Sequence, residues 1–107
     1  MKQIAPAALA AWIADTGRSK PLLLDVREPW EYQTCSIAGS HHIPMGEIPV
    51  RRGEIDREAE VVVICHHGGR SMQVAMFLEK NGFSKLHNLA GGVDAWAKGI
   101  EPSMPVY

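Results

Sequence analysis

The sequence predicts an α/β domain built on a mainly parallel sheet. Two short apolar runs, Pro21 to Val26 (PLLLDV) and Val61 to Ile64 (VVVI), have the length and composition of buried strands. Segments with helical spacing separate such runs, and strands that alternate with helices are typical of a parallel sheet. Sheets of this kind bind ligands beyond the carboxyl ends of their strands. The functional site is therefore expected near the residues at which these apolar runs end.

The N-terminal segment is expected to form an amphipathic helix. Pro6 provides a helix start, because proline is favoured in the first turn, and Leu9, Trp12 and Ile13 recur at helical spacing. A lysine followed by an apolar stretch also weakly resembles a signal peptide. A bulky tryptophan fits poorly before a small-residue cleavage point, so the helix is the favoured interpretation.

The rest of the chain is expected to alternate between short strands and helices. The best supported helix is Ser71–Asn81, because Met72, Ala75 and Met76 share one face and Gly82 supplies a stop. The other expected elements, in chain order, are a turn and short helix over Arg27–Cys35, a strand at His42–Ile43, a polar helix or loop over 46–60, a strand over Lys85–Leu89, a last helix within Ala90–Gly99 and an extended tail over Ile100–Tyr107.

The composition is that of an ordinary soluble protein. Its 107 residues fit a single domain, 1–107, that can bury a hydrophobic core without the help of disulfide bonds or a structural metal ion. A net charge of −1 gives no reason to expect nucleic acid or a membrane surface as a partner. Cys35 and Cys65 are too few for a disulfide scaffold, which favours the cytoplasm, and no apolar run approaches the roughly 18 residues of a membrane span.

The segment CHHGGRS, which follows the Val61–Ile64 run, combines a nucleophile with an anion-binding loop. Its two glycines let backbone N–H groups turn inward, and the helix that begins near Ser71 points its positive end at the same place. Arg70 adds a permanent charge, and the two histidines can add partial charge near neutral pH. Each effect favours thiolate over thiol at Cys65. The sequence therefore predicts Cys65 as the catalytic nucleophile and His66, His67, Gly68, Gly69, Arg70 and Ser71 as substrate-binding residues.

A structural role for the same residues is the alternative. Cys65 could be a small buried hydrophobe at a strand end, with the glycines only forming a turn. The convergence of glycines, an arginine and a helix start on one thiol favours the nucleophile. One histidine can face the pocket while the other faces solvent, so neither is assigned a catalytic step.

The spacing of Arg70 distinguishes two classes of enzyme. Cysteine phosphatases place an arginine six positions after the cysteine. Sulfurtransferases hold a persulfide on the cysteine and usually have a loop that is one residue shorter. Arg70 is five positions after Cys65, and the sixth residue is Ser71. The spacing favours sulfur chemistry over a cysteine phosphatase or arsenate reductase.

Four segments in the same order resemble the single-domain rhodaneses, the thiosulfate sulfurtransferase family. They are LLLDVREPWEY, CSIAGSHHIPM, VVVICHHGGRS and NLAGGVDAWAKGIEPSMPV. The second segment has Cys35-Ser36 where the family commonly has Gly-His, a departure that does not touch the nucleophile. The resemblance covers essentially the whole chain. It implies a central, mainly parallel five-stranded sheet with helices on both faces.

The resemblance also implies a double-displacement reaction. Cys65 would take sulfane sulfur from thiosulfate or a similar donor as a persulfide, and pass it to cyanide or to a thiol acceptor, which can be a protein. Arg70, with His66 or His67, would bind the donor's anionic oxygens. The intermediate is covalent, so neither a cofactor nor a metal is expected. A persulfide carrier and a non-enzymatic binding module remain as alternatives.

Several polar residues outside the loop are expected to be structural. Asp25 and Arg27 are expected to form a buried pair that organises a loop. Cys35 is expected to be a tolerated small residue and not a resolving thiol. His41 and His42 are expected to be structural or exposed, since no third metal ligand lies nearby in the sequence.

Overall fold

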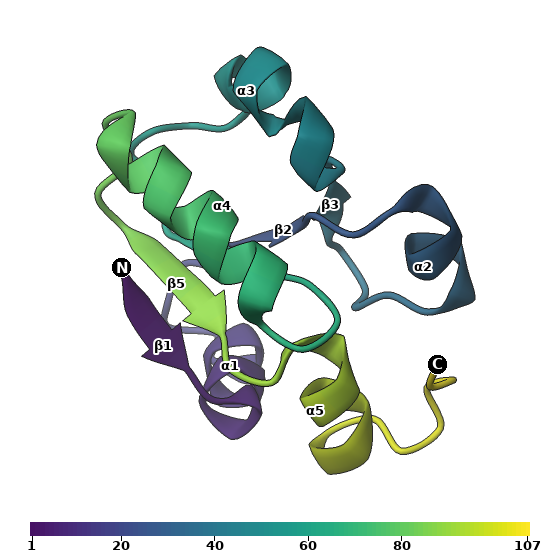
Figure 1. The fold of residues 1–107 in the computed structure, drawn as a ribbon. Coiled ribbons are helices and arrows are strands. Elements are labelled where there is room, and N and C mark those ends of the chain that lie inside the picture. Colours follow the sequence, from purple (N-terminus) through teal and green to yellow (C-terminus); the bar gives the residue numbers. More distant parts are fainter.

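The apolar runs form the middle of a five-stranded sheet in which every pair of neighbouring strands is parallel. A computed structural model describes all residues 1–107 (Figure 1). The strands are β1 (Lys2–Ile4), β2 (Leu22–Asp25), β3 (His41–His42), β4 (Val61–Ile64) and β5 (Leu86–Leu89), in the spatial order β1-β5-β4-β2-β3. The helices are α1 (Pro6–Ala14), α2 (Pro29–Thr34), α3 (Ile48–Arg51), α4 (Gly69–Lys80) and α5 (Gly92–Gly99), with 3-10 helices η1 (Met45–Glu47) and η2 (Arg52–Glu54) on either side of α3.

Alternate side chains of the central strands enter two separate cores. Val61 and Val63 of β4 pack with α3 and α4, whereas Val62 and Ile64 pack with α1 and α5. Because successive side chains of a strand point to opposite faces, an unbroken apolar run has to be covered on both sides. Figure 1 shows α4 lying along the sheet with α1 beyond it. The expected α/β fold with helices on both faces is confirmed.

The strand order places a topological switch between β2 and β4. After β2 the chain moves outward to β3, whereas after β4 it moves the opposite way to β5. A crevice therefore opens beyond the carboxyl ends of these two strands. Asp25 is in register with Ile64, and the Val26 N–H donates to the Ile64 carbonyl at 2.9 Å. The segments that begin with Arg27 and Cys65 consequently start side by side.

Strand β1 is the element that the sequence did not predict. Lys2 and Gln3 are exposed and Ile4 is half-buried, so no apolar run marks this edge strand. Its position comes from the parallel pairing with β5. The expected amphipathic helix after it is confirmed as α1.

Other boundaries shift by one or two residues. Helix α4 begins at Gly69 and not near Ser71, which places Arg70 in its first turn. The strand expected at His42–Ile43 spans His41–His42. The segment that begins at Met45 folds into η1, α3 and η2.

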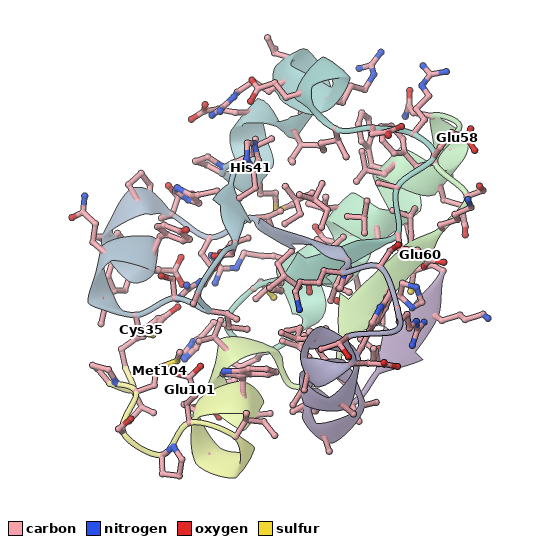
Figure 2. All side chains as sticks on the ribbon, turned by 180° about the vertical axis from the view of Figure 1, so that it is seen from behind. Cys35, His41, Glu58, Glu60, Glu101 and Met104 are labelled. Atoms are coloured by element: carbon pink, nitrogen blue, oxygen red, sulfur yellow. The ribbon has the colours of Figure 1, made fainter.

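The C-terminal tail, expected to be extended, contains a turn and packs back against the domain. The Met104 N–H donates to the Glu101 carbonyl at 2.9 Å, and Met104 is buried in the same cluster as Cys35. Figure 2 labels these side chains near α5 and the end of α2. Across the chain, no helix has the length and apolar character needed to cross a lipid bilayer.

The core on the α4 side is expected to set much of the stability. Leu24 of β2 is 0% exposed. Leu24→Ala should lower the free energy of unfolding by about 2–5 kcal/mol, because it removes buried methyl groups and leaves a cavity. Urea unfolding followed by circular dichroism measures the change. The control Val50→Ala, at a residue that is 89% exposed, should change the free energy by less than about 0.5 kcal/mol. Equal effects of the two substitutions would contradict this packing.

Candidate active site

Cys65 lies at the end of β4 and is 1% exposed. Its Sγ accepts a hydrogen bond from the Gly68 N–H at 3.0 Å and lies 3.3 Å from Ser71 Oγ. Gly68 adopts a φ of +106°, a conformation that favours glycine, and α4 starts immediately after it. The sulfur is thus close to the positive end of a 12-residue helix, where a negative charge is stabilised.

Ser71 lies between the Cys65 sulfur and the side-chain amide of Asn88. Its Oγ is also hydrogen-bonded to Oδ1 of Asn88, whose Nδ2 donates to the Gly68 carbonyl at 3.2 Å and to Gln3 Oε1 at 3.0 Å. A hydroxyl has one proton to donate. A Cys65 thiolate can take that proton as a hydrogen bond, whereas a thiol can donate to Ser71 Oγ while the hydroxyl donates to Asn88. The Ser71 hydroxyl can therefore serve both forms of Cys65.

The loop backbone is held against α5. The carbonyl oxygens of Cys65 and His66 accept hydrogen bonds from the N–H groups of Val93 at 2.9 Å and Asp94 at 3.1 Å. A Cβ on Gly92 would collide with both carbonyl oxygens. A glycine is thus required for this close approach, which fixes the loop that carries the thiol relative to α5.

Arg70 is paired with a buried carboxylate. Its Nη1 and Nη2 donate to the two oxygens of Glu31 at 2.6 and 2.8 Å, and Glu31 is 4% exposed. The Glu28 N–H also donates to Glu31, which completes a capping box at the start of α2. Hydrogen bonds from Arg70 outweigh the effect of burial and lower the pKa of Glu31 to about 2. The charge of Arg70 is therefore balanced within the protein, which the sequence did not predict.

Arg27 links β2, α2 and the tail. It is fully buried, and its Nε and Nη2 donate to Asp25 at 2.9 and 2.7 Å. The remaining donors reach the Glu31 carbonyl at 3.2 Å, the Cys35 carbonyl at 2.7 Å and the Tyr107 hydroxyl at 3.0 Å. Burial disfavours the guanidinium charge, but the hydrogen bonds to Asp25 and Tyr107 more than offset it and raise the pKa of Arg27. The expected structural pair is confirmed.

The two loop histidines differ in their surroundings. His66 is half-buried and stacks on Tyr107, with ring centroids 4.0 Å apart, whereas His67 is exposed. Burial, and then the proximity of His67, lower the pKa of His66 and so disfavour its charged form. His66 therefore contributes less of the partial positive charge expected from the loop histidines. The Nε2 atom of His67 is 3.9 Å from Asp94 Oδ2.

In the pair His41 and His42, expected to be structural or exposed, His42 is structural and the His41 side chain is 43% exposed. His42 Nε2–H donates to the Arg27 carbonyl at 2.7 Å, and its ring stacks on Tyr32 at 4.4 Å. His41 is 3.6 Å from a single carboxylate, that of Glu54.

Comparisons with known proteins show the family to which this chain belongs. The family described as the rhodanese-like domain matches residues 5–99, which is most of the chain. The chain belongs to the rhodanese-like domain family. The resemblance of its four motifs to the rhodaneses is thereby confirmed.

Individual relatives share both sequence and fold with this rhodanese-like domain. It is 36% identical over 98 residues to a sulfurtransferase of Allochromatium vinosum, covering 92% of this chain and 90% of that protein. It is 42% identical over 74 residues to the putative sulfur carrier protein YrkF of Bacillus subtilis, covering 69% of this chain and 40% of that protein. The crystal structure of a rhodanese-related protein from Thermoplasma volcanium aligns with a TM-score of 0.81 at 34% identity, covering 100% of this chain and 98% of that one. The domain spans well under half the length of several other curated relatives.

The structure gathers the predicted site residues and adds Glu31 and Tyr107, to which the sequence assigned no role in the site. Cys65 to Ser71 occupy one loop and the first turn of α4, but only Gly68 and Ser71 donate to the sulfur. Glu31 was visible only as part of the motif LLLDVREPWEY that resembles the rhodaneses, without a role assigned to it. Tyr107 gave no signal, because its hydroxyl reaches Glu31 at 2.8 Å only when the tail folds back. Burial raises the pKa of Tyr107 to about 12, so the phenol stays neutral.

The Glu31–Arg70 pair should make the rhodanese-like domain sensitive to acid. Because the folded-state pKa of Glu31 is lowered from 4.5 to about 2, the pair contributes fully above pH 4.5, and its contribution is lost as pH falls towards 2. Urea unfolding at pH 6 and pH 3 should show a loss of roughly 1–2 kcal/mol from this group. Glu31→Gln should lack that part of the loss, whereas Glu54→Gln should retain it. An unchanged loss in Glu31→Gln would contradict the assignment.

Proposed function

We propose that this rhodanese-like domain is a sulfurtransferase in which Cys65 carries the transferred sulfur as a persulfide. The observation that carries the proposal is the setting of Cys65 Sγ, 3.0 Å from the Gly68 N–H and 3.3 Å from Ser71 Oγ at the start of α4. Fixed donors of this kind stabilise a sulfur anion without needing a nearby base. The match to a sulfurtransferase of A. vinosum supports the same chemistry.

The first half-reaction loads the cysteine. The Cys65 thiolate attacks the sulfane sulfur of thiosulfate, a bond forms between Sγ and that sulfur, and the sulfur–sulfur bond of thiosulfate breaks. Its electron pair leaves with sulfite, so no external oxidant or reductant is required. The first amides of a helix have no acceptor within that helix, and those of α4 are available to hold the outer sulfur of the persulfide.

The second half-reaction returns the enzyme to its starting state. An acceptor nucleophile, cyanide or a thiolate, attacks the outer sulfur of the Cys65 persulfide. The sulfur–sulfur bond of the persulfide breaks, and Cys65 leaves as a thiolate that accepts hydrogen bonds from Gly68 and Ser71. A covalent intermediate of this type leads to ping-pong kinetics.

Intact mass spectrometry tests the covalent step. Incubation with thiosulfate should add the mass of one sulfur atom, and cyanide should then remove it. Cys65→Ser should gain nothing. The matched control is Cys35→Ser, which removes the other free cysteine and should still gain the sulfur. A gain in Cys65→Ser, or its loss in Cys35→Ser alone, would contradict the proposal.

A persulfide carrier is a second candidate, favoured by the charge balance of the site. Arg70 is paired with Glu31 and Arg27 with Asp25, so both arginines already have a carboxylate partner. Thiosulfate is a dianion and gains little from a guanidinium that is already neutralised. A thiol persulfide carries less charge and depends less on an unpaired cation. The match to a putative sulfur carrier of B. subtilis supports this variant.

The rate of Cys65 loading from two donors separates the candidates. In a carrier, a thiol persulfide should load Cys65 faster than thiosulfate does. Glu31→Gln keeps the shape of the side chain but frees the charge of Arg70, and should speed loading from thiosulfate by roughly fivefold. Loading from the thiol persulfide should change less.

The matched control for this experiment is Glu54→Gln, at an exposed carboxylate on η2, which should alter neither rate. If Glu31→Gln slowed the loading of Cys65 equally from both donors, Glu31 would be positioning Arg70 and not masking its charge.

A further inference from the structure

We propose that His66, His67 and Asp94 form a binding site for a late first-row divalent cation, with Zn²⁺ as the best-suited ion. The two histidines belong to the Cys65 loop, and Asp94 belongs to the first turn of α5. The site does not depend on the proposed sulfur transfer, because it uses neither the thiol nor the donors that contact it.

The donor atoms are close enough to share one ion. One ligand atom from each residue lies within 4.8 Å of the other two, and His67 Nε2 is 3.9 Å from Asp94 Oδ2. Ligands at normal zinc distances in a tetrahedral site are separated by roughly 3.4 Å. Small side-chain rotations, above all of the exposed His67, therefore bring the three atoms to coordinating distance.

The backbone holds the two ligand-bearing segments together. The Asp94 N–H donates to the His66 carbonyl at 3.1 Å, and the absence of a Cβ on Gly92 permits this contact. The His66 ring is further restrained by stacking on Tyr107 at 4.0 Å. Two of the three ligands are thus positioned before an ion binds, which lowers the entropic cost of forming the site.

The chemistry of the three donors selects the class of ion. Two imidazoles and one carboxylate suit zinc, whereas calcium and magnesium prefer sites made only of oxygen ligands. His67 is exposed, and His66 and Asp94 are half-buried, so the ion can enter from solvent and keep water in a fourth position.

Lys98 is the competitor for this site. Its Nζ lies 2.9 Å from Asp94 Oδ2, one turn along α5, and its side chain is 70% exposed. Exposed ion pairs of this kind contribute little stability, so a divalent cation can displace the ammonium group. Removing the lysine should accordingly tighten metal binding.

The chain contains internal controls. His41 lies near Glu54 and His87 near Glu60, but each pair offers a single imidazole and a single carboxylate. Figure 2 labels His41 on β3 and Glu60 before β4, both away from α5. The group that contains three such ligands is the one beside Cys65.

Isothermal titration calorimetry with ZnCl2 tests the proposal in a Cys65→Ser background, on protein without a histidine tag. This background removes the reactive thiol, so the outcome is independent of sulfur transfer. One Zn²⁺ should bind per chain. His67→Ala and Asp94→Asn should each weaken binding by at least about tenfold.

Two further substitutions are expected not to weaken Zn²⁺ binding. Lys98→Met should tighten binding by roughly two- to fivefold, because it removes the competing cation. His41→Ala should leave the affinity unchanged. Absence of Zn²⁺ binding, retention of the parent affinity in His67→Ala, or loss of binding in His41→Ala would each overturn the proposal. Circular dichroism establishes that every variant is folded.

Discussion

The buried guanidinium of Arg27 is the interaction on which the site depends. A guanidinium has five N–H donors, and a buried one has to satisfy them within the protein. Arg27 does so by joining Asp25 at the end of β2 to two carbonyl groups of the α2 region and to the Tyr107 hydroxyl. These bonds place α2 beside the carboxyl end of β4. The position of Glu31, and through it that of Arg70, follows from them.

The consequence is a reactive loop with little unbalanced charge. The candidate nucleophile Cys65 receives hydrogen bonds from an amide and a hydroxyl, while Arg70 is held by a carboxylate and burial disfavours the charged form of His66. Dipoles, more than full charges, therefore stabilise the sulfur. Such an arrangement suits a sulfur anion that must alternate between thiolate and persulfide, because neither form has to break a strong ion pair. Under the proposed sulfur transfer, the charge of the donor is expected to affect the rate of loading.

The two histidines of the CHHGGRS segment acquire a different significance in the folded protein. They do not reach the sulfur with a hydrogen bond; His66 stacks on Tyr107 and His67 faces Asp94. The same close contact between the loop and α5 that fixes Cys65 also brings a carboxylate next to two imidazoles. The candidate nucleophile and the proposed cation site thus lie on the same loop, which the hydrogen bond from the Asp94 N–H to the His66 carbonyl joins to α5.

Local patterns were sufficient to predict the centre of the sheet, the helix after it and the segment that carries Cys65. An unbroken run such as Val61–Ile64 has to be buried on both faces, and the glycines and the helix start act on a cysteine only a few residues away. Strand β1 could not be predicted in this way, since three residues with mostly exposed side chains become a strand only by pairing with β5.

The tertiary structure decided which charges meet. Glu31 and Arg70 are far apart in the sequence, as are Tyr107 and Arg27, and their contacts exist because β2 and β4 are neighbours and the tail folds back. Residue type and spacing determine what a segment can do chemically. Whether an arginine is free to bind a substrate, or an aspartate lies beside two histidines, depends on contacts between segments that the linear pattern does not record.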